Sequence, residues 1–377
     1  MTAEASPIVA IAGDPGGAAA VAPVLELLRQ QGRRLRSLAY RQAVANWRSR
    51  GLDVEELPPS TNVEQAQRYL STPRAGILLS ATSDNGINLE KPFFAAARRL
   101  GIPSLAVLDH WMNYRLRFAN EQGELAYLPD RIAIMDAQAQ EEMIADGLDA
   151  GRLVVTGQPA FDELTSFRRS VSPQLRQEVR QRLGIGDDQR IVLFASEPIS
   201  TMCGTEPSQP LYPGYTEQTV LREVATALQR IAARTTEKVV LVVRPHPLDN
   251  PKSLHLAAQP PLRLVVDGRG KGREVVLASD LVTGMTTVLL VEACLLGCVV
   301  LSVQPGLRFA DALPTNRWGV SRVVYRGEEI EPALASLLFD EAIRAEAVAR
   351  TEKIRIEPGA AQRIVCLLDS MLGRPSV

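Results

Sequence analysis

A regular alternation of short apolar runs with helix-like segments is the feature that most constrains the fold of this chain. Apolar runs of strand length occupy residues 7–13, 75–81, 103–109, 130–136 and 152–157, and a second series occupies 190–197, 238–246, 262–268, 279–284 and 298–304. Segments with a helical spacing of apolar residues lie between most of these runs. Because strands that alternate with helices form βαβ units, we predict an α/β protein with two parallel sheets.

The first helix-like segment shows the pattern. Four apolar residues fall on one face of it: Val21, Val24, Leu25 and Leu28. Gly32 follows as a stop signal.

Residues 163–189 separate the two series of strands. This segment is charged, poor in large apolar residues and ended by Gly and Asp, as linkers between domains often are. A chain of 377 residues is also long enough for about two domains. We predict an N-terminal domain at 1–165, a C-terminal domain at 166–355 and a C-terminal helix at 356–377 that packs back on the N-terminal domain. Such pairs usually bind ligands in a cleft, at the carboxyl ends of their strands.

The composition excludes several classes of protein. A formal net charge of −1 argues against a nucleic-acid-binding domain but leaves a local cationic pocket open. No leader-like segment and no apolar stretch of roughly 18 residues is present, which favours a cytoplasmic protein. The cysteines show neither a CxxC pair nor a metal-binding spacing, and we interpret them as core residues in a reducing compartment. They are Cys203, Cys294, Cys298 and Cys366.

The stretch VVRPHPLDNP, residues 242–251, places one of only three histidines between two prolines at the end of an apolar run. Pro245 and Pro247 restrict the backbone on both sides of His246, so the imidazole loses little entropy on binding. Arg244 lies two residues earlier, and a histidine beside an arginine suits a phosphate group. A loop histidine that caps a nearby carbonyl is the alternative. We favour phosphate binding.

Residues 279–306 contain a strand that ends at Gly284 and leads into an apolar helix. Thr286 and Thr287 stand where this helix begins, and free backbone N–H groups with two hydroxyls make an anion site. Glu292 is an isolated charge among mostly apolar positions and must find hydrogen-bond donors. Ribose hydroxyls would serve as donors, and so would a backbone group or a salt bridge. We favour the ligand interpretation.

The turn GDPGG, residues 13–17, joins the first strand to the first helix. It lacks the lysine of a P-loop and the full G-x-G-x-x-G spacing, so glycines of an ordinary tight turn are an equal alternative. Asp14 would project from the end of the first strand, where a carboxylate could act on an acceptor hydroxyl. We assign Gly16 and Gly17 to the acceptor side.

The segment LDHWMNYRLRF, residues 108–118, also follows a strand and combines polar, aromatic and cationic groups, which favours a binding loop. Its candidates are Asp109, His110, Trp111, Asn113, Tyr114 and Arg115. Trp111 and Tyr114 could stack on a sugar or a base, or could close the bottom of a core. Four residues around the preceding strand-to-helix turn are expected to shape the same cleft: Ser83, Asn85, Glu90 and Lys91.

A long irregular segment at 194–217 follows the first strand of the second series. Loops of this length in compact domains are usually functional, and we single out Ser196, Glu197 and Tyr215. His255, in contrast, has the surroundings of a surface helix, and we expect it to be structural.

Taken together, these motifs resemble the GT-B glycosyltransferase superfamily. The resemblance rests on VVTGQPAFDEL at 154–164, VRPHP at 243–247 and TTVLLVEACLLG at 286–297. The chain looks closest to bacterial surface-polysaccharide enzymes with a His-Pro motif, such as polysialyltransferase-, capsule Kdo-transferase- and glycerophosphate-transferase-like enzymes. The resemblance spans most of the chain. It implies two Rossmann-like domains facing across a cleft, a nucleotide-sugar donor and a glycan or lipid-linked acceptor.

The resemblance also implies roles for single residues. His246 and Pro247 would contact the nucleotide phosphate. Asp14, or Asp109 with His110, would be the general base. The remaining donor-side residues would be Arg244, Gly284, Ser196 and Glu197, with Thr286 and Thr287 on phosphate oxygens and Glu292 on the ribose.

Two differences between this sequence and motifs of the superfamily indicate the type of reaction. Retaining members often carry two glutamates eight positions apart, but positions 284 and 300, eight residues on either side of Glu292, hold Gly and Val, so we expect inversion. No Asp-x-Asp motif occurs, so we expect metal-independent transfer without a cofactor, with the nucleotide-sugar as a substrate.

Two other functions remain open. A non-hydrolysing sugar-nucleotide 2-epimerase shares the architecture and a His-Pro segment, although its serine-glycine-glycine turn is replaced here by GMTT. A non-catalytic sugar-nucleotide-binding protein is the third possibility. The basic segment at 29–41 would touch a membrane surface if the acceptor is lipid-linked, or it is a solvated helix end. The sequence gives no indication of the oligomeric state.

Overall fold

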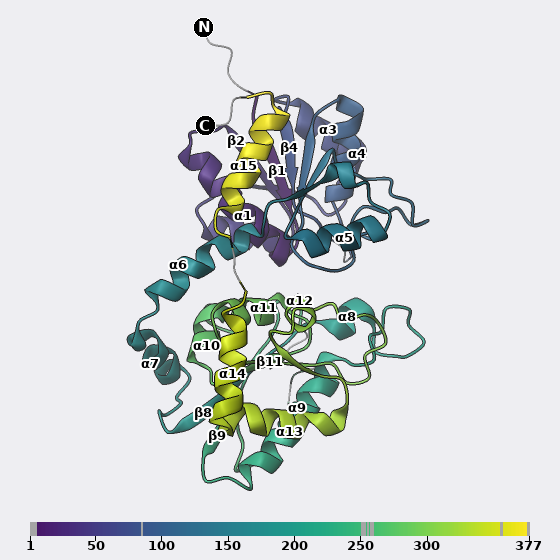
Figure 1. Cartoon of the computed structure of the whole chain (residues 1–377). Helices are drawn as coiled ribbons and strands as arrows, with labels where there is room; N and C mark the ends of the chain where they lie inside the picture. Colours follow the sequence, from purple (N-terminus) through teal and green to yellow (C-terminus); the bar gives the residue numbers. More distant parts are fainter. Residues whose placement is uncertain are drawn as a thin grey trace. The chain divides into compact units, whose positions relative to one another are not determined.

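The computed structural model describes residues 6–83, 86–249, 254, 256, 260–354 and 357–374. The chain divides into two compact units, each described here by itself (Figure 1). The N-terminal unit comprises Met1–Glu163 and Ile356–Val377, and the C-terminal unit comprises Leu164–Arg355.

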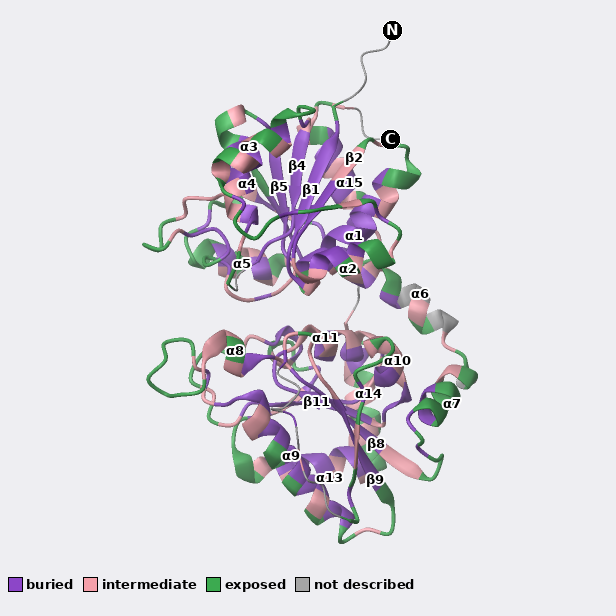
Figure 2. Cartoon of the chain, turned by 180° about the vertical axis from the view of Figure 1, so that it is seen from behind, coloured by how far each residue is buried: buried purple, intermediate pink, exposed green. Residues whose placement is uncertain are grey.

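The N-terminal unit is built on a parallel sheet of seven strands in the order β3-β2-β1-β4-β5-β6-β7. The strands are β1 (Ile8–Ala12), β2 (Leu35–Ala39), β3 (Val54–Glu56), β4 (Ile77–Ser80), β5 (Ser104–Val107), β6 (Arg131–Ile134) and β7 (Leu153–Val155). Strands β1, β4 and β5 are buried along their length (Figure 2). A strand covered on both faces must be apolar throughout, which explains the continuous apolar runs in the sequence.

Helices cover this sheet. They are α1 (Pro15–Gln30), α2 (Gln42–Ser49), α3 (Val63–Ser71), α4 (Glu90–Leu100), α5 (Ala137–Ala145) and α15 (Ala360–Met371), with short 3-10 turns η1 (Ala150–Arg152) and η2 (Pro159–Phe161). The prediction for α1 is confirmed: all four residues of its predicted face are fully buried, and Gly32 follows with a φ of 69°.

The C-terminal helix α15 belongs to the N-terminal unit because it packs against α1. Ile364 and Leu368 of α15 are fully buried in the same core cluster as Val21 and Leu25. The carboxylate of Asp162 accepts hydrogen bonds from the backbone N–H groups of residues 359–361, at the start of α15. This carboxylate neutralises unpaired donors at the start of the helix and fixes where the returning chain docks.

The C-terminal unit repeats the architecture with six parallel strands in the order β10-β9-β8-β11-β12-β13. The strands are β8 (Gln189–Ala195), β9 (Lys238–Arg244), β10 (Arg263–Val266), β11 (Leu281–Gly284), β12 (Val300–Val303) and β13 (Arg322–Val324). The helices are α6 (Asp162–Ser170), which begins in the N-terminal unit, α7 (Pro173–Arg182), α8 (Ile199–Cys203), α9 (Glu217–Ala232), α10 (Gly272–Ala278), α11 (Val288–Leu295), α12 (Pro314–Arg317), α13 (Gly327–Phe339) and α14 (Glu341–Thr351).

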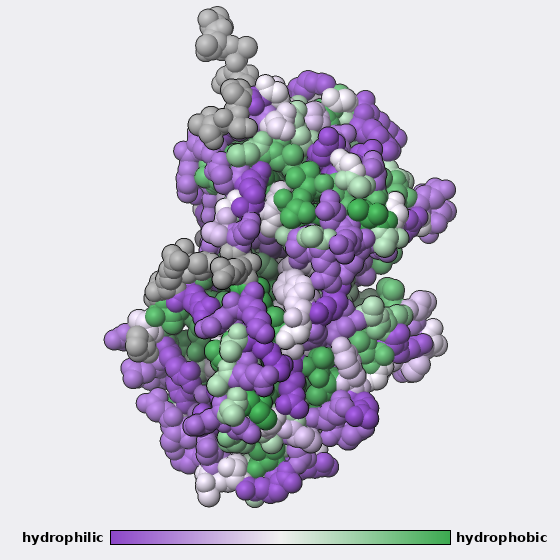
Figure 3. All heavy atoms as spheres, viewed as in Figure 1, coloured by the Kyte–Doolittle hydropathy of each residue, from purple (hydrophilic) through white to green (hydrophobic). Residues whose placement is uncertain are grey.

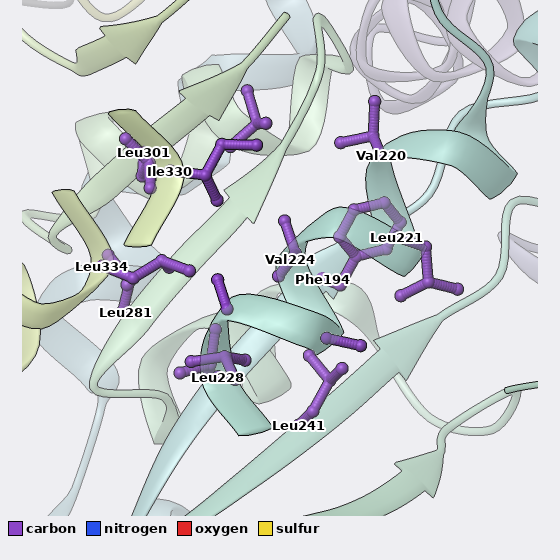
Figure 4. Close-up of a cluster of buried hydrophobic side chains, with 14 of the residues drawn as sticks. Phe194, Val220, Leu221, Val224, Leu228, Leu241, Leu281, Leu301, Ile330 and Leu334 are labelled. Atoms are coloured by element: carbon purple, nitrogen blue, oxygen red, sulfur yellow. The ribbon is translucent and has the colours of Figure 1, made fainter. Parts of the chain in front are cut away.

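One face of this second sheet packs against α9 and α13 (Figure 4). Val220, Val224 and Leu228 recur at helical spacing along α9 and are fully buried, together with Phe194 of β8 and Leu241 of β9. Truncating one such side chain to alanine costs about 2–5 kcal/mol of folding free energy. This core holds the strands whose carboxyl ends carry the candidate site.

All ten apolar runs that the sequence predicts as strands are strands in the structure. Three further strands, β2, β3 and β13, were not predicted. Strand β2 contains Arg36 and Ser37, and β3 and β13 have three residues each, so none of them shows a continuous apolar run. β3 and β13 are edge strands, where shielding from solvent is partial, and the first two residues of β2 are only half-buried, so these strands need no continuous run of apolar side chains.

Hydrophilic residues cover most of the visible face of the molecule, and hydrophobic residues form small groups between them (Figure 3). None of the helices in the described part of the chain combines the length and the hydrophobicity that crossing a membrane requires.

Candidate functional site

A pocket of about 380 Å³ lies at the carboxyl ends of four strands in the C-terminal unit. It is lined by Ala195, Ser196, Arg244, Pro245, His246, Pro247, Gly268, Thr287 and Leu289. The chain runs outward from β8 through β9 and β10 on one side and through β11, β12 and β13 on the other. The strand order therefore reverses between β8 and β11, which is where open α/β sheets bind their ligands. The structure thus brings the His-Pro segment and the threonine-led helix start to one pocket.

His246 is held by the turn that follows β9. Its backbone N–H donates to Oδ2 of Asp249 at 2.6 Å, and the N–H of Asp249 donates back to the His246 carbonyl at 2.9 Å. The N–H of Leu248 donates to Nδ1 of the imidazole at 3.1 Å. Because Nδ1 accepts a hydrogen bond, the proton of the neutral ring lies on Nε2.

Burial lowers the pKa of His246 to about 4. The imidazole is therefore neutral near pH 7 and offers Nε2–H as a hydrogen-bond donor. The sequence left open whether this histidine would act as a cation or as a neutral donor, and the structure favours the neutral donor. Pro245 and Pro247 line the same pocket on either side of it.

The start of α11 is only partly available to a ligand. The backbone N–H and the hydroxyl of Thr286 both donate to Oε2 of Glu197, at 3.0 and 2.8 Å. Thr287 caps the helix by accepting from the N–H of Leu289 at 3.4 Å. The N–H groups of Thr287 and Val288 donate to no acceptor among the described residues. Of the predicted anion site, only these two N–H groups are left for a ligand. The N–H and hydroxyl of Thr286 bind the carboxylate of Glu197 instead.

Gly284 has a purely steric reason to be glycine. A Cβ at this position would lie 2.6 Å from the carbonyl oxygen of Ala195 on the neighbouring strand β8. Any larger residue would push β8 and β11 apart, at the edge where the pocket forms. Gly284, which we predicted to lie on the donor side, therefore allows β8 and β11 to approach each other beside the pocket.

Glu197 is the centre of a group of carboxylates beside the pocket. Burial raises the pKa of Glu197, and the nearby Asp249 and Glu217 raise it further. Ser200 donates its backbone N–H to Glu217 at 2.8 Å and also donates its hydroxyl to that carboxylate. Burial also raises the pKa of Asp249. This group shapes the loop after β8 and carries negative charge toward the start of α11.

Arg244 and Glu292 have protein partners. The guanidinium of Arg244 donates to the carbonyls of Arg269 and Gly270 at 2.9 and 2.7 Å and to Asp267 at 3.2 Å. It therefore fastens the loop between β10 and α10 at the wall of the pocket, and its contact with phosphate stays a prediction. Glu292 accepts from Arg273 at 2.6 Å and is not among the residues that line the pocket. The salt bridge that the sequence offered as its alternative partner is present.

In the N-terminal unit the strand order reverses between β1 and β4. Asp14 follows β1, is 7% exposed and forms an ion pair with Arg41 at 2.9 Å. Gly17, in the first turn of α1, lies so close to β4 that a Cβ would be 2.8 Å from the Cβ of Ala81. Gly17 is thus explained by helix-to-strand packing rather than by contact with an acceptor.

Asp109 follows β5 and lies at the same helix start. Its Oδ1 accepts from the buried Arg117 at 2.7 Å, and its backbone carbonyl accepts from Gln158 at 2.9 Å. A Cβ on Gly16 would be 2.3 Å from Oδ2 of Asp109, so Gly16 leaves room for this carboxylate. The neighbouring His110 packs its ring against Trp111, with 6.4 Å between the ring centroids. Asp14 and Asp109 therefore flank the start of α1, each paired with an arginine.

The aromatic residues of the 108–118 segment are core residues, which corrects their predicted contact with an acceptor. Trp111 is 4% exposed, stacks on Phe161 and donates Nε1–H to Asp136 at 2.7 Å. Tyr114 is 5% exposed and donates to Glu142 at 2.5 Å. The alternative that the sequence offered, the closing of a core, is the observed one.

Two polar residues of this segment shape the loop. Arg115 donates to the carbonyls of Gly123 and Asp146, which ties the loop to the end of α5. Asn113 has a φ of 57°, a left-handed conformation that asparagine tolerates better than most residues. Both residues have conformational roles in the structure.

A buried polar cluster beside Gly13 joins Ser83 and Glu90, which the sequence indicated, to Tyr40, which it did not. Tyr40, which follows β2, donates to Glu90 at 2.5 Å, and Ser83 donates to the same carboxylate at 2.9 Å. Burial raises the pKa of both Tyr40 and Glu90. A Cβ on Gly13 would clash with the Tyr40 ring, so this glycine permits the contact. If β2 had been predicted from the sequence, Tyr40 would have been placed at the carboxyl end of that strand, near the start of α1.

Four remaining predictions concern other parts of the chain. Lys91 lies over the Tyr127 ring, 6.0 Å from its centroid. Tyr215 is 3% exposed and donates to Gln304. Asn85 and His255 lie outside the described residues.

The four cysteines are free thiols. Cys294 is fully buried, and burial raises the pKa of Cys294 to about 12 and that of Cys298 to about 11. Protonated, shielded thiols of this kind are poor nucleophiles. Cys294 is thus a core residue as predicted, whereas Cys203, Cys298 and Cys366 are only half-buried.

Part of the chain matches a known protein family. Residues 139–284 match the family described as CDP-Glycerol:Poly(glycerophosphate) glycerophosphotransferase. The match includes the loop after β8 and the His246 turn, and it ends at Gly284. It covers less than half of the chain, and the sequence matches none of the curated proteins with which it was compared.

The fold resembles solved structures over nearly the whole chain. A Staphylococcus aureus MnaA–UDP co-structure has a TM-score of 0.73 at 15% identity and covers 99% of both chains. UDP-GlcNAc 2-epimerase from Neisseria meningitidis bound to UDP-GlcNAc has a TM-score of 0.71 at 14% identity, with coverage of 97% of this chain and 100% of that one. MurG from Acinetobacter baumannii has a TM-score of 0.58 at 15% identity, with coverage of 97% and 99%.

These similarities confirm the predicted fold class. The chain has two parallel-sheet α/β domains, and its structural neighbours have the GT-B fold. At such low sequence identity the likeness concerns the fold alone.

Proposed function

We propose that the protein is a glycosyltransferase that moves a sugar from a nucleotide-activated donor to a glycan or lipid-linked acceptor in surface-polysaccharide biosynthesis. The observation that carries this proposal is the neutral His246 in the pocket of the C-terminal unit, with Nδ1 occupied by the Leu248 N–H and Nε2–H left as a donor. The family match over 139–284 and the UDP-bound structural neighbours support a nucleotide-activated donor.

The donor phosphates would bind to the pocket through neutral groups. Nε2–H of His246 and the N–H groups of Thr287 and Val288 would meet the charge that develops on the leaving phosphate. Hydrogen bonds from preorganised neutral donors stabilise such charge without the cost of burying a cation. Glu292 would reach the ribose from α11 while Arg273 holds its other side.

The acceptor would be activated by a carboxylate of the N-terminal unit. Asp109 is our candidate for the general base, because Arg117 binds its Oδ1 and leaves Oδ2 beside Gly16. Asp14 is the second candidate. The acceptor oxygen would form a bond to the anomeric carbon as the bond to the donor phosphate breaks, with inversion and transfer of the acceptor proton to the carboxylate. The sequence contains no Asp-x-Asp motif, and we propose that the transfer is metal-independent.

A sugar-nucleotide 2-epimerase is the second candidate function. Structures titled as UDP-GlcNAc 2-epimerases match this chain over almost its full length, with TM-scores up to 0.71. Incubation with a sugar nucleotide and no acceptor separates the two functions. Interconversion at the sugar without an acceptor would establish the epimerase, whereas consumption of donor only when an acceptor is added would establish the transferase.

A thermal-shift screen with cytidine and uridine diphosphates and their activated sugars or polyols tests the donor site. We expect one set of nucleotides to raise the melting temperature in proportion to its affinity and the other to leave it unchanged. His246→Ala should abolish the shift. The absence of any shift with either set in the unaltered protein would overturn the proposed function.

A further inference from the structure

The stretch from Arg29 to Arg74 differs in charge from the rest of the chain. It contains nine arginines and four acidic residues, although the whole chain has a net charge of −1. The three-dimensional structure gathers several of these arginines on one surface of the N-terminal unit. A sequence interpretation of residues 29–41 as a solvated helix end does not account for this grouping.

Two neighbouring hollows form this surface, which we call the arginine surface. One, of about 370 Å³, is lined by Arg29 of α1, by Arg33 of the turn that follows α1, and by Arg36 of β2. The other, of about 300 Å³, is lined by Arg36 again and by Arg68 of α3. Because Arg36 lines both, the hollows form one continuous track across two helices and a strand.

Arg36 shapes the track rather than offering itself to a ligand. Its Nε and Nη2 donate to Glu55 at 2.9 and 2.8 Å, its Nη1 donates to the Tyr69 carbonyl at 2.7 Å, and its guanidinium lies over the Tyr69 ring. This geometry neutralises Glu55, one of the two acidic residues in the larger hollow. Asp53 is the other.

The other three arginines keep donors for a ligand. Arg29 donates from Nη1 to the Gly51 carbonyl at 2.6 Å, and Arg33 donates from Nη2 to Asp369 at 2.7 Å. Each guanidinium carries five N–H groups, so these contacts fix the side chains and leave most of their donors available. Arg68 is exposed, and its guanidinium donates to no acceptor among the described residues.

The arginine surface lies at the opposite end of the sheet from the candidate base. Its larger hollow is lined by Leu35, where β2 begins, whereas Asp14 and Asp109 follow the carboxyl ends of β1 and β5. In a parallel sheet these ends are separated by the length of a strand, roughly 16 Å for five residues. The arginine surface is therefore separate from the region of the candidate base.

The arrangement of the charges indicates the kind of ligand. The guanidinium groups come from separate elements and line two hollows in succession, which suits an anion repeated along a chain better than a single phosphate. Among the described residues, the large hydrophobic side chains that are exposed begin only at Ile87, so none is available here for insertion into lipid. Arg36 lies over one face of the Tyr69 ring and the Phe93 ring lies 6.1 Å from it, which disfavours stacking of a base there.

We propose that the arginine surface binds a linear chain of phosphate groups, as a phosphodiester-linked polymer carries. That this polymer is the acceptor of the transfer rests on the proposed function, whereas the binding of a phosphate chain to the arginine surface does not. A polymer held here would keep its growing end near the enzyme between transfers and raise the effective concentration of acceptor.

Inorganic polyphosphate is the probe for this proposal, with the full chain and the double variant Arg29→Glu/Arg68→Glu. We expect the unaltered protein to bind polyphosphate with an affinity that falls steeply as salt is raised, and the double variant to bind at least tenfold more weakly. Arg131→Glu is the matched control, since Arg131 is an exposed arginine of the same unit whose guanidinium donates to the neighbouring Asp130 carbonyl. The control should bind as the unaltered protein does.

Three results would overturn the proposal: equal binding by the double variant, an equal loss in the Arg131→Glu control, or binding to vesicles of anionic phospholipid without binding to polyphosphate. Nucleotide binding, measured by thermal shift, should be the same in all three proteins and shows that they are folded. If nucleotides raise the melting temperature of none of the three proteins while polyphosphate still binds, the proposed function is wrong, but the proposal for the arginine surface is supported.

Discussion

The two units place strands in the same order but equip the resulting crevice differently. In both, the first strand of the unit lies at the centre and the order reverses beside it, between β1 and β4 or between β8 and β11. The C-terminal unit has a pocket there that is lined by a neutral histidine and by Thr287, whose N–H donates to no acceptor among the described residues. The N-terminal unit has carboxylates there that are paired with arginines.

The two helix starts show how a fold can be adapted to opposite tasks. At the start of α11, Glu197 is held by the N–H and hydroxyl of Thr286 rather than by an arginine. At the start of α1, Asp14 and Asp109 are balanced by Arg41 and Arg117. Neutral donors suit a phosphate that must leave, whereas a carboxylate held by arginine suits a proton acceptor fixed in position. The comparison teaches that strand order sets where a site forms and side-chain partners set what it binds.

The largest effect is expected at His246. Replacement by Ala or Asn should lower turnover about 10²- to 10³-fold, because both remove the donor at Nε2. His246→Gln, whose amide can donate near the Nε2 position, should recover part of the activity. Steady-state kinetics with nucleotide donor and acceptor measures this effect. Equal activity of the Asn and Gln variants would show that Nε2–H is not the group that matters.

The next effect sharpens the contrast between the two carboxylates of the N-terminal unit. Asp109→Asn should lower kcat about 10²-fold and leave donor binding unchanged, since the base acts on the acceptor alone. Asp14→Asn should have a smaller effect on kcat. Kinetics together with nucleotide titration distinguishes the two variants. If Asp14→Asn has the larger effect on kcat, Asp14 is the base.

The pH dependence of stability probes the neutral state of His246. The unfolded chain takes up a proton on this ring near the ordinary pKa of 6.5, whereas the folded protein does so only near pH 4. The neutral histidine therefore makes its full contribution to the free energy of unfolding above pH 6.5. This contribution is lost as the pH falls toward 4, and the loss is about 2 kcal/mol at pH 5.

Urea unfolding at pH 7 and pH 5 measures this loss, with His246→Gln as the reference. The raised pKa values of Glu197 and Asp249 act in the opposite direction, but both proteins carry these groups, so the difference between the proteins isolates the histidine. An identical pH response of the two proteins would contradict a depressed pKa of His246.

The smallest effect concerns Glu197. Glu197→Gln keeps an oxygen that can accept from Thr286 and removes a negative charge beside the proposed phosphate site. We expect nucleoside diphosphates to bind about fivefold more tightly, by roughly 1 kcal/mol. Isothermal titration calorimetry measures the affinity. Weaker binding would show that this carboxylate helps to hold the ligand rather than opposing it.

The sequence predicted the strands and the first helix because burial on both faces demands apolar side chains. It also predicted that His246 and Thr287 would share a pocket, because both follow strands of one parallel sheet. It did not predict β2, where Arg36 and Ser37 interrupt the apolar pattern, and so missed Tyr40 at the end of that strand. Trp111 could not be assigned from sequence because an aromatic ring serves a core and a binding surface equally well.

By itself, the sequence determined two parallel α/β sheets and the edge at which each collects its polar residues, because periodicity and chain direction are local properties. The tertiary structure alone decided which partner each charge has: Arg244 with Asp267, Glu292 with Arg273, Thr286 with Glu197, and the arginines of three elements on one surface. Those pairings join residues far apart in the chain. They depend on the distances between side chains, which sequence spacing does not encode.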